Sequence, residues 1–115
     1  MSRKGDAFSF DRTADWEAAG PGVHRKVLCY DGGVMMVRVT FEAGAVGPPH
    51  SHPHVQCSLV ESGVFDITIA GRKERLRAGD SFLVPSGALH DALAVEAGTL
   101  VDVFTPMRED FIKAP

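Results

Sequence analysis

The sequence predicts an all-β sandwich or barrel, and three observations support this prediction. Short runs of alternating or β-branched residues recur along the chain, whereas almost no segment has the periodicity of an amphipathic helix. Turn signals rich in Gly and Asp separate these runs at close spacing. The chain has 115 residues, of which 44% are hydrophobic, so it is large enough to bury one core. Many short strands joined by tight turns are typical of sandwiches and barrels.

The expected strands follow one another along most of the chain. They cover residues 7–10, 23–30, 34–41, 55–60, 64–70, 73–77, 81–84, 88–95 and 99–105. Residues 13–22 (TADWEAAGPG) are expected to form a loop with at most one helical turn, and residues 108–113 (REDFIK) a short helix or an ordered tail. No repeat or linker divides the sequence, so residues 1–115 are expected to form a single domain.

Composition narrows the class of protein. The net charge is −3 and Lys and Arg are scattered, so we expect no nucleic-acid partner. All apolar runs are shorter than the roughly 20 residues that span a bilayer, so we expect no membrane partner. Cys29 and Cys57 lack the spacing of a paired framework, which fits a reducing interior and predicts a cytoplasmic protein. Cys57 is expected to be a buried, inert thiol.

Three of the five histidines lie in one stretch, PPHSHPHVQ (48–56). On a regular strand, alternate residues point to the same face, so His50, His52, His54 and Gln56 would project together. Neutral nitrogen and oxygen donors of this kind suit zinc, nickel, manganese or iron(II). One short strand rarely completes a metal site, and His90 in PSGALHD is the best candidate for a further ligand.

These two regions resemble the two motifs of the cupin superfamily. Residues 44–63 contain G-x5-H-x-H-x3-Q-x6-G, with Gln56 where most cupins have Glu. Residues 79–94 contain G-x5-P-x-G-x2-H, ending in Ala where many members have Asn. The resemblance implies a small single-domain cupin, a jelly-roll β-barrel (a double-stranded β-helix). It also implies one divalent transition metal (Ni, Zn, Mn or Fe) held by His50, His52, Gln56 and His90, with His54 supporting a ligand or at the rim; whether His54 is itself a ligand stays open.

A second group of residues lies in LVDVFTPMRED (100–110). Asp is depleted in strands, yet Asp102 lies among apolar neighbours, and alternation places Asp102 and Phe104 on one face. A partly buried carboxylate beside a cation can carry a proton, and Arg108 can bind a substrate carboxylate. The alternative interpretation is that Asp102 caps a turn or pairs with an arginine, Phe104 is core, and Arg108 is solvated.

The combination of HSHPHVQ, VESGVF and EAGTLVDVFTPMRED resembles the KdgF family of pectin degradation proteins. The resemblance extends over nearly the whole chain. It implies a metal-dependent enzyme that converts 4,5-unsaturated uronates, the products of pectate or alginate lyases, into the linear keto form. The family's active-site Asp, Phe and Arg correspond to Asp102, Phe104 and Arg108. The chain departs from the family at Val55 and at Ser58-Leu59, where Thr-Tyr is common.

Other interpretations remain open at this level. One is a mononuclear iron or manganese cupin dioxygenase, although a neutral Gln56 ligand favours oxygen activation less than Glu would. Another is a non-catalytic metal-binding or sugar-binding module. Arg25 and Arg38 can each reach the mouth of the barrel or lie on the surface. Small cupins often exchange an N-terminal strand such as residues 7–10, so a homodimer that binds an anionic sugar is expected.

Overall fold

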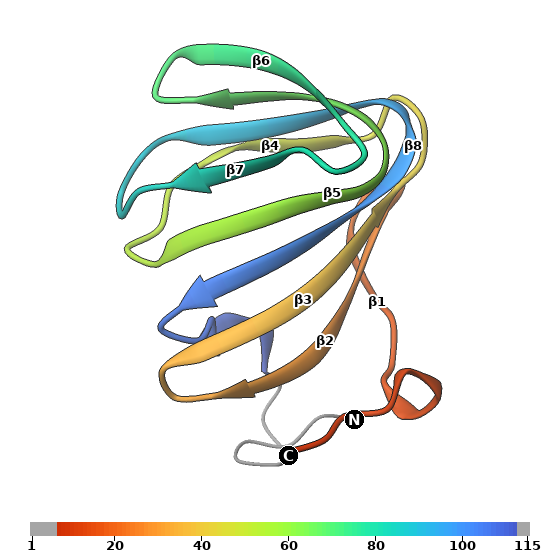
Figure 1. The fold of residues 1–115 in the computed structure, drawn as a ribbon, viewed down its shortest axis with the longest axis vertical. Helices are drawn as coiled ribbons and strands as arrows, with labels where there is room; N and C mark the ends of the chain where they lie inside the picture. The colour runs from red at the N-terminus through yellow and green to blue at the C-terminus, as the bar shows by residue number, and fades with distance from the viewer. Residues whose placement is uncertain (1–6, 113–115) are drawn as a thin grey trace.

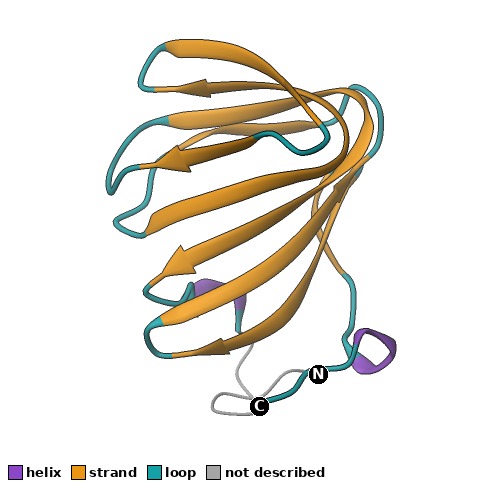
Figure 2. Ribbon diagram, in the orientation of Figure 1, coloured by secondary structure: helices purple, strands orange, loops and turns teal. Residues whose placement is uncertain are grey.

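The computed structural model describes residues 7–112 and is built almost entirely of strands (Figures 1 and 2). The elements are η1 (Asp11–Thr13), β1 (Glu17–Gly20), β2 (Val23–Asp31), β3 (Val34–Phe41), β4 (Val46–His50), β5 (Val55–Ile69), β6 (Arg72–Arg77), β7 (Ser81–Val84), β8 (His90–Thr105) and η2 (Glu109–Phe111). Both η elements are single 3-10 turns. In the described part of the chain, no helix has the length and apolar run needed to cross a membrane.

Two long strands, β5 and β8, organise the fold. Near the start of β5, residues 55–62 pair with the end of β8, and β3 and β7 extend this layer. Near the end of β5, residues 64–69 pair with the start of β8, and β4 and β6 extend the second layer. Both strands bend between these halves, so the layers face each other in the jelly-roll arrangement (Figure 1). The predicted all-β jelly roll is confirmed, although the sheet does not close completely.

The bend requires two glycines that lie back to back. Gly98 in β8 faces Ser62 and Gly63 in β5, and a Cβ at residue 98 would lie 2.7 Å from the Gly63 Cα. A Cβ at residue 63 would lie 2.6 Å from the Ala97 carbonyl oxygen, and Gly63 also has a φ of 85°. The neighbouring atoms belong to the backbone, so they cannot move aside as a side chain would. The pairing register of β5 also shifts here, where the strand turns from one layer into the other.

Replacing Gly98 with Ala should therefore destabilise the fold strongly. The added methyl group overlaps the Ser62 backbone, and we expect the free energy of unfolding to fall by about 3 kcal/mol. Gly33→Ala is the matched control, because the nearest atom to its Cβ is the Asp31 Oδ1 at 3.6 Å. Urea denaturation of both variants measures the difference. Equal stability of the two variants would contradict this account of the bend.

The inner face is apolar near the bend and contains both polar and apolar side chains away from it. The main core cluster consists of Val23, Phe41, Val60, Phe65, Ile67, Ala94 and Leu100. Further from the bend along β5 and β8, the buried inward side chains include the polar Gln56, Ser58 and Asp102, beside a second apolar cluster of Met35, Val37 and Phe104. The loops that precede β5 and β8 lie at the same open end, on the left of Figure 1. The fold therefore gathers buried polar groups at the end opposite the apolar core.

Several sequence predictions were confirmed and others were wrong. The strands expected at 34–41 and 81–84 match β3 and β7, and a short helix does occupy part of 108–112, with Lys113 outside the described residues. Residues 7–10 form no strand, and Phe8 is 80% exposed. A short strand, β1, forms within 13–22 by pairing with β2.

Other corrections concern where the strands are continuous and how exposed the Cys57 side chain is. The runs 55–60 and 64–69 belong to one strand, β5, and the runs 90–95 and 99–105 belong to one strand, β8, whereas Ala70, Ala88 and Leu89 lie outside both strands. The stretch 50–56 is not one regular strand, because β4 ends at His50 and β5 begins at Val55. Cys57 faces away from the interior as expected, but it is exposed rather than buried. That residues 1–115 form a single domain stays a prediction.

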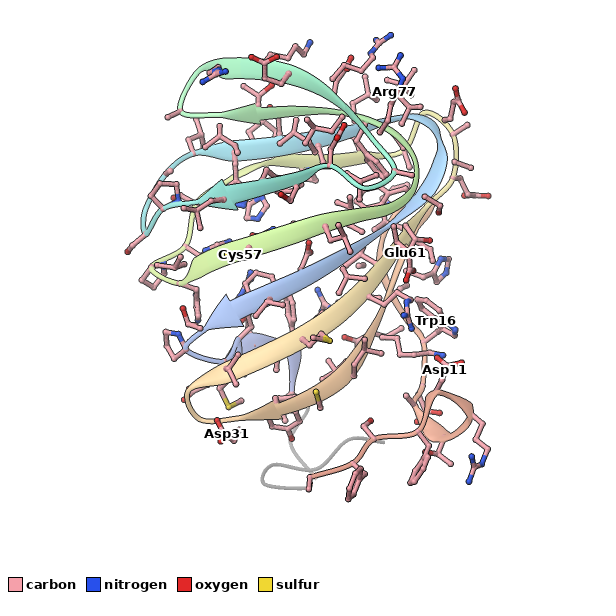
Figure 3. The ribbon with its side chains drawn as sticks, viewed as in Figure 1. Asp11, Trp16, Asp31, Cys57, Glu61 and Arg77 are labelled. Atoms are coloured by element: carbon pink, nitrogen blue, oxygen red, sulfur yellow. The ribbon has the colours of Figure 1, made fainter. Side chains whose placement is uncertain are left out.

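The N-terminal segment is held against the outer side of β2. The Lys26 side chain is buried, and its Nζ donates to Asp11 Oδ1 at 2.9 Å and lies 4.5 Å from the centroid of the Trp16 ring. Arg38 pairs with Glu61 and approaches Asp11 to 3.7 Å. Asp11, Trp16 and Glu61 follow one another along one side of the molecule (Figure 3). Arg38 is therefore part of this outer network and does not line the mouth of the barrel.

Candidate metal centre and adjoining cavity

Three histidines from two distant segments of the chain converge at the open end. His50 is the last residue of β4, His52 lies in the following loop, and His90 begins β8. One nitrogen from each ring lies within 4.8 Å of the others, and the His50 and His90 rings are 4.2 Å apart between centroids. His52 and His90 are buried, whereas His50 is exposed. The three rings can therefore hold one metal ion.

Each of these rings is oriented by a backbone carbonyl. The Nδ1 atoms of His50, His52 and His90 donate to the carbonyl oxygens of Pro48, His54 and Ala88, at 2.8, 3.1 and 2.9 Å. A carbonyl oxygen only accepts, so the proton of each neutral ring lies on Nδ1. The lone pair then lies on Nε2, which is the arrangement that metal-ligating histidines usually have. Burial lowers the pKa of His52 and His90, which keeps both rings neutral.

Two further observations fit a cation at this centre. The His90 Nε2 is buried and has no hydrogen-bond partner among the described residues. The His52 Nε2 lies 3.1 Å from the Gln56 Oε1, although a neutral ring with its proton on Nδ1 cannot donate from Nε2. Two lone pairs that face each other repel unless a cation binds both.

His54 lies beside this centre rather than in it. Its Nε2 donates to the Met107 carbonyl oxygen at 3.1 Å, and its ring packs edge-on against Phe104 with centroids 6.4 Å apart. Its backbone oxygen accepts the hydrogen bond from His52. His54 is absent from the group of residues 7–112 whose donor atoms converge. His54 therefore lies outside the converging group and supports His52 through its backbone oxygen.

A hydrogen-bonded chain connects Gln56 to Asp102. The Gln56 Nε2 donates to the Ser58 Oγ at 2.9 Å, and this hydroxyl donates to the Asp102 Oδ1 at 2.6 Å. Asp102 is 8% exposed, and burial raises its pKa to about 6, while the Ser58 hydrogen bond and the Arg108 charge act in the opposite direction. Asp102 is thus an inward-facing carboxyl, and the interpretation of it as a turn cap is wrong.

Phe104 and Arg108 follow Asp102 along the chain and lie further from the bend than Asp102 does. Phe104 is buried, packs against Met35 and Val37, and lies edge-on to His52 with centroids 5.7 Å apart. Arg108 lies over the Phe104 ring, and its Nε and Nη2 donate to Asp110 at 3.0 and 2.8 Å. The Arg108 side chain is only 13% exposed, so it is not a solvated surface charge.

These groups surround one cavity of about 220 Å³. Its lining includes His50, Gln56, His90, Asp102, Phe104 and Arg108. Sequence reasoning did not identify Phe111 in this lining or Ser58 beside Gln56, and it left Arg25 undecided between the mouth of the barrel and the surface. Ser58 lies two residues after Gln56, so both side chains point to the same face of the strand. The alternation of side chains along a strand would have been enough to identify Ser58. Nothing local to the sequence places Arg25 or Phe111, because their positions depend on how the ends of the chain pack.

A family model described as cupin domain matches residues 37–104. This match spans more than half of the chain, and it agrees with the jelly-roll fold and the three-histidine centre, so the chain belongs to the cupin family. The pectin degradation protein KdgF of Dickeya dadantii (strain 3937) is 36% identical to it over 107 residues, covering 91% of this chain and 97% of that protein. Within the cupins, the chain therefore belongs to the KdgF family.

Solved structures give the same result. A RmlC-like cupin from Shewanella frigidimarina is similar with a TM-score of 0.91 and 38% identity, covering 95% of this chain and 98% of that one. KdgF from a Halomonas species is similar with a TM-score of 0.87 and 38% identity, covering 93% and 99% of the two chains. Both similarities extend over almost the full length of each chain, so they include the open end as well as the core.

Proposed function

We propose that this chain is a metal-dependent enzyme that converts 4,5-unsaturated uronates, the products of pectin or alginate lyases, into the linear keto form. The observation that carries the proposal is the placement of a buried carboxyl, Asp102, in the same cavity as the three-histidine centre and Arg108. The 36% identity to a pectin degradation protein over nearly the full length supports the substrate class.

The proposed metal ligands are His50, His52, Gln56 and His90. These side chains are all neutral, so a divalent ion would keep its full charge there. When bound, such an ion supplies Lewis-acid chemistry, which polarises an oxygen atom of a ligand. The donor set suits nickel, zinc, manganese or iron, and cellular availability selects among them as much as affinity does.

Asp102 is proposed to move the proton. The substrate is a cyclic hemiacetal whose ring oxygen is attached to the carbon–carbon double bond. Asp102 takes the proton of the anomeric hydroxyl, the bond between the anomeric carbon and the ring oxygen breaks, and an aldehyde and an enolate form. The protonated Asp102 then returns the proton to the former double-bond carbon, and the enolate becomes a ketone. The net change is an isomerisation, so it needs no oxidant or reductant.

Arg108 and Phe104 are proposed to bind the substrate. The guanidinium of Arg108 offers a charged partner for the uronate carboxylate. Its Nε–Nη2 edge is already bound to Asp110, which is 60% exposed at its side chain, so the substrate must displace Asp110 or bind at Nη1. Phe104 lines the cavity and gives the sugar an apolar surface to pack on.

The deciding experiment follows the absorbance of an unsaturated uronate. The protein loaded with one divalent metal should consume it, and the same protein stripped by a chelator should not, until the metal is restored. Air-saturated and oxygen-free samples should react at the same rate, because no oxygen is used. Equal rates with and without metal, or uptake of oxygen in place of uronate turnover, would overturn the proposal.

Ser58 is proposed to position Gln56 and Asp102. Ser58→Ala removes the hydroxyl between them and leaves two buried polar groups unpaired, so stability should fall by about 1–3 kcal/mol. We also expect metal affinity or turnover to fall about tenfold, as for other residues that support ligands. Ser58→Thr retains the hydroxyl and should retain both properties. Metal titration and denaturation test this, and loss of function in both variants would contradict the hydroxyl's role.

We also propose a homodimer, and residues 7–10, which form no strand in the single chain, do not by themselves identify its contact surface. Apolar side chains instead gather on the outer face of β3, β5, β7 and β8, around a shallow groove lined by Met36, Cys57, Leu59, Leu83, Val101 and Val103. Sedimentation at micromolar concentration should show a dimer. Leu59→Arg should give monomers, whereas Val46→Arg on β4 should not. A monomeric unmodified protein would contradict this.

A further inference from the structure

Arg25 brings a second guanidinium into the cavity. It lies on β2, opposite Val39 of β3, on the side of the strand that faces the interior. Its side chain is 23% exposed and lines the same cavity as His50, His90 and Arg108. By contrast, Arg38 on the neighbouring strand pairs with Glu61 outside the barrel. Sequence analysis did not distinguish these two arginines, but in the structure Arg25 lines the cavity and Arg38 lies outside it.

Arg25 and Arg108 share one aromatic partner. The Arg25 guanidinium carbon lies 3.8 Å from the centroid of the Phe111 ring, and that of Arg108 lies 4.3 Å from the same centroid. Phe111 itself packs edge-on against Phe104, with centroids 5.6 Å apart. The Asp110 carboxyl is influenced by both cations, because the Arg108 hydrogen bond lowers its pKa most and the Arg25 charge contributes in the same direction. The two positive groups thus form one local cluster.

Arg25 is held in place by a partner at the edge of the structure. Its Nε donates to the Glu17 Oε1 at 2.6 Å, and the Glu17 side chain is 21% exposed. Glu17 begins β1, a four-residue strand that pairs with β2. Arg25 and Arg108 therefore each have a carboxylate partner on a short terminal element, Glu17 on β1 and Asp110 on η2. A guanidinium that binds a protein carboxylate can exchange it for the carboxylate of a ligand, because the same donors fit both.

Resting on the proposed function, we propose that Arg25 is a second substrate-binding residue, which together with Arg108 binds the carboxylate of the sugar acid at the cavity. In this arrangement the Glu17 carboxylate binds the Arg25 guanidinium when the substrate is absent. It therefore competes with the substrate carboxylate for Arg25. Positive charge on both sides of Phe111 then selects anionic sugars over neutral ones of the same size.

The test measures binding rather than turnover. Metal-loaded protein is titrated with D-galacturonate, a saturated uronate that does not react, and with D-galactose as its neutral counterpart. Galacturonate should bind and galactose should bind far more weakly. Arg25→Gln should raise the Kd for galacturonate about tenfold to a hundredfold, which is the usual effect of losing a hydrogen bond to a charged group. Arg25→Lys, which keeps the charge but not the planar group, should lie in between and provides a second variant if Arg25→Gln folds poorly.

Two further variants separate binding from a purely structural role. Glu17→Gln removes the competing carboxylate and should lower the Kd a few-fold, the opposite direction from Arg25→Gln. If Arg25 only ties the chain ends together, both substitutions break the same tie and should change the Kd in the same direction. Arg38→Gln is the matched control, because its side chain is 29% exposed yet lies outside the cavity, and it should leave the Kd unchanged.

The two proposals fail in distinguishable ways. If galacturonate binds as expected but unsaturated uronates are not consumed, the proposed reaction is wrong and the role of Arg25 in anion binding stands. If uronates are consumed but Arg25→Gln binds galacturonate as tightly as the unmodified protein, only the role of Arg25 is overturned. If galacturonate does not bind to the unmodified protein at all, both the role of Arg25 and the substrate class are wrong.

Discussion

Replacing Asp102 with Asn should lower the turnover of unsaturated uronates by about 10² to 10⁴-fold, the usual contribution of a positioned proton carrier. Asn has nearly the same shape and can still accept the hydrogen bond from Ser58, but it cannot take up and return a proton. Metal content and galacturonate binding should remain close to those of the unmodified protein. A stopped or continuous absorbance assay measures the rate, and full activity of this variant would remove Asp102 from the proposed reaction.

The same substitution has a pH-dependent effect on stability in metal-free protein. Burial raises the pKa of Asp102 to about 6, above the 3.8 expected in the unfolded chain. As pH rises from about 4 to 6, the unfolded chain therefore loses this proton first, and the free energy of unfolding decreases. Above about pH 6 the loss reaches a plateau of about 3 kcal/mol. Asp102→Asn lacks this ionisation, so its stability should exceed that of the unmodified protein at neutral pH.

Replacing His90 with Ala should abolish tight metal binding and, with it, turnover. His90 contributes one of three converging imidazoles, and its Nε2 has no other partner among the described residues. Metal should raise the melting temperature of the unmodified protein, because a ligand present at 100 times its Kd adds about 2.7 kcal/mol of stability. The variant should show no such rise, and metal analysis should find it largely empty.

His24 provides the matched control for that experiment. It lies on β2, is exposed, and does not belong to the converging group, so His24→Ala should bind metal normally. His54→Ala should also retain the metal, because His54 bonds to the Met107 carbonyl oxygen instead. A His90→Ala protein that bound one metal per chain with unchanged affinity would contradict the proposed ligand set.

Much of the site was predictable from the sequence because its signals are local. The spacing of His50 and His52, and the later His90, indicated a metal centre before any contact was known. Alternation placed Asp102 and Phe104 on one face of a strand, and both are indeed buried on the inner face. Residue spacing along a strand decides which side chains point to the same face, so alternation in the sequence predicts this feature of the structure. The roles proposed for these residues stay predictions.

The sequence by itself thus determined the all-β class, most strands and the metal-binding donor types, because these depend on residue type and spacing. Tertiary structure decided the rest. Gly63 and Gly98 join pairs of expected strands into β5 and β8 only because two backbones touch there. Arg25 lines the cavity and Arg38 does not, because the direction in which each side chain points depends on how its strand packs in the fold. Such outcomes are set by contacts between distant segments, and local alternation carries no information about them.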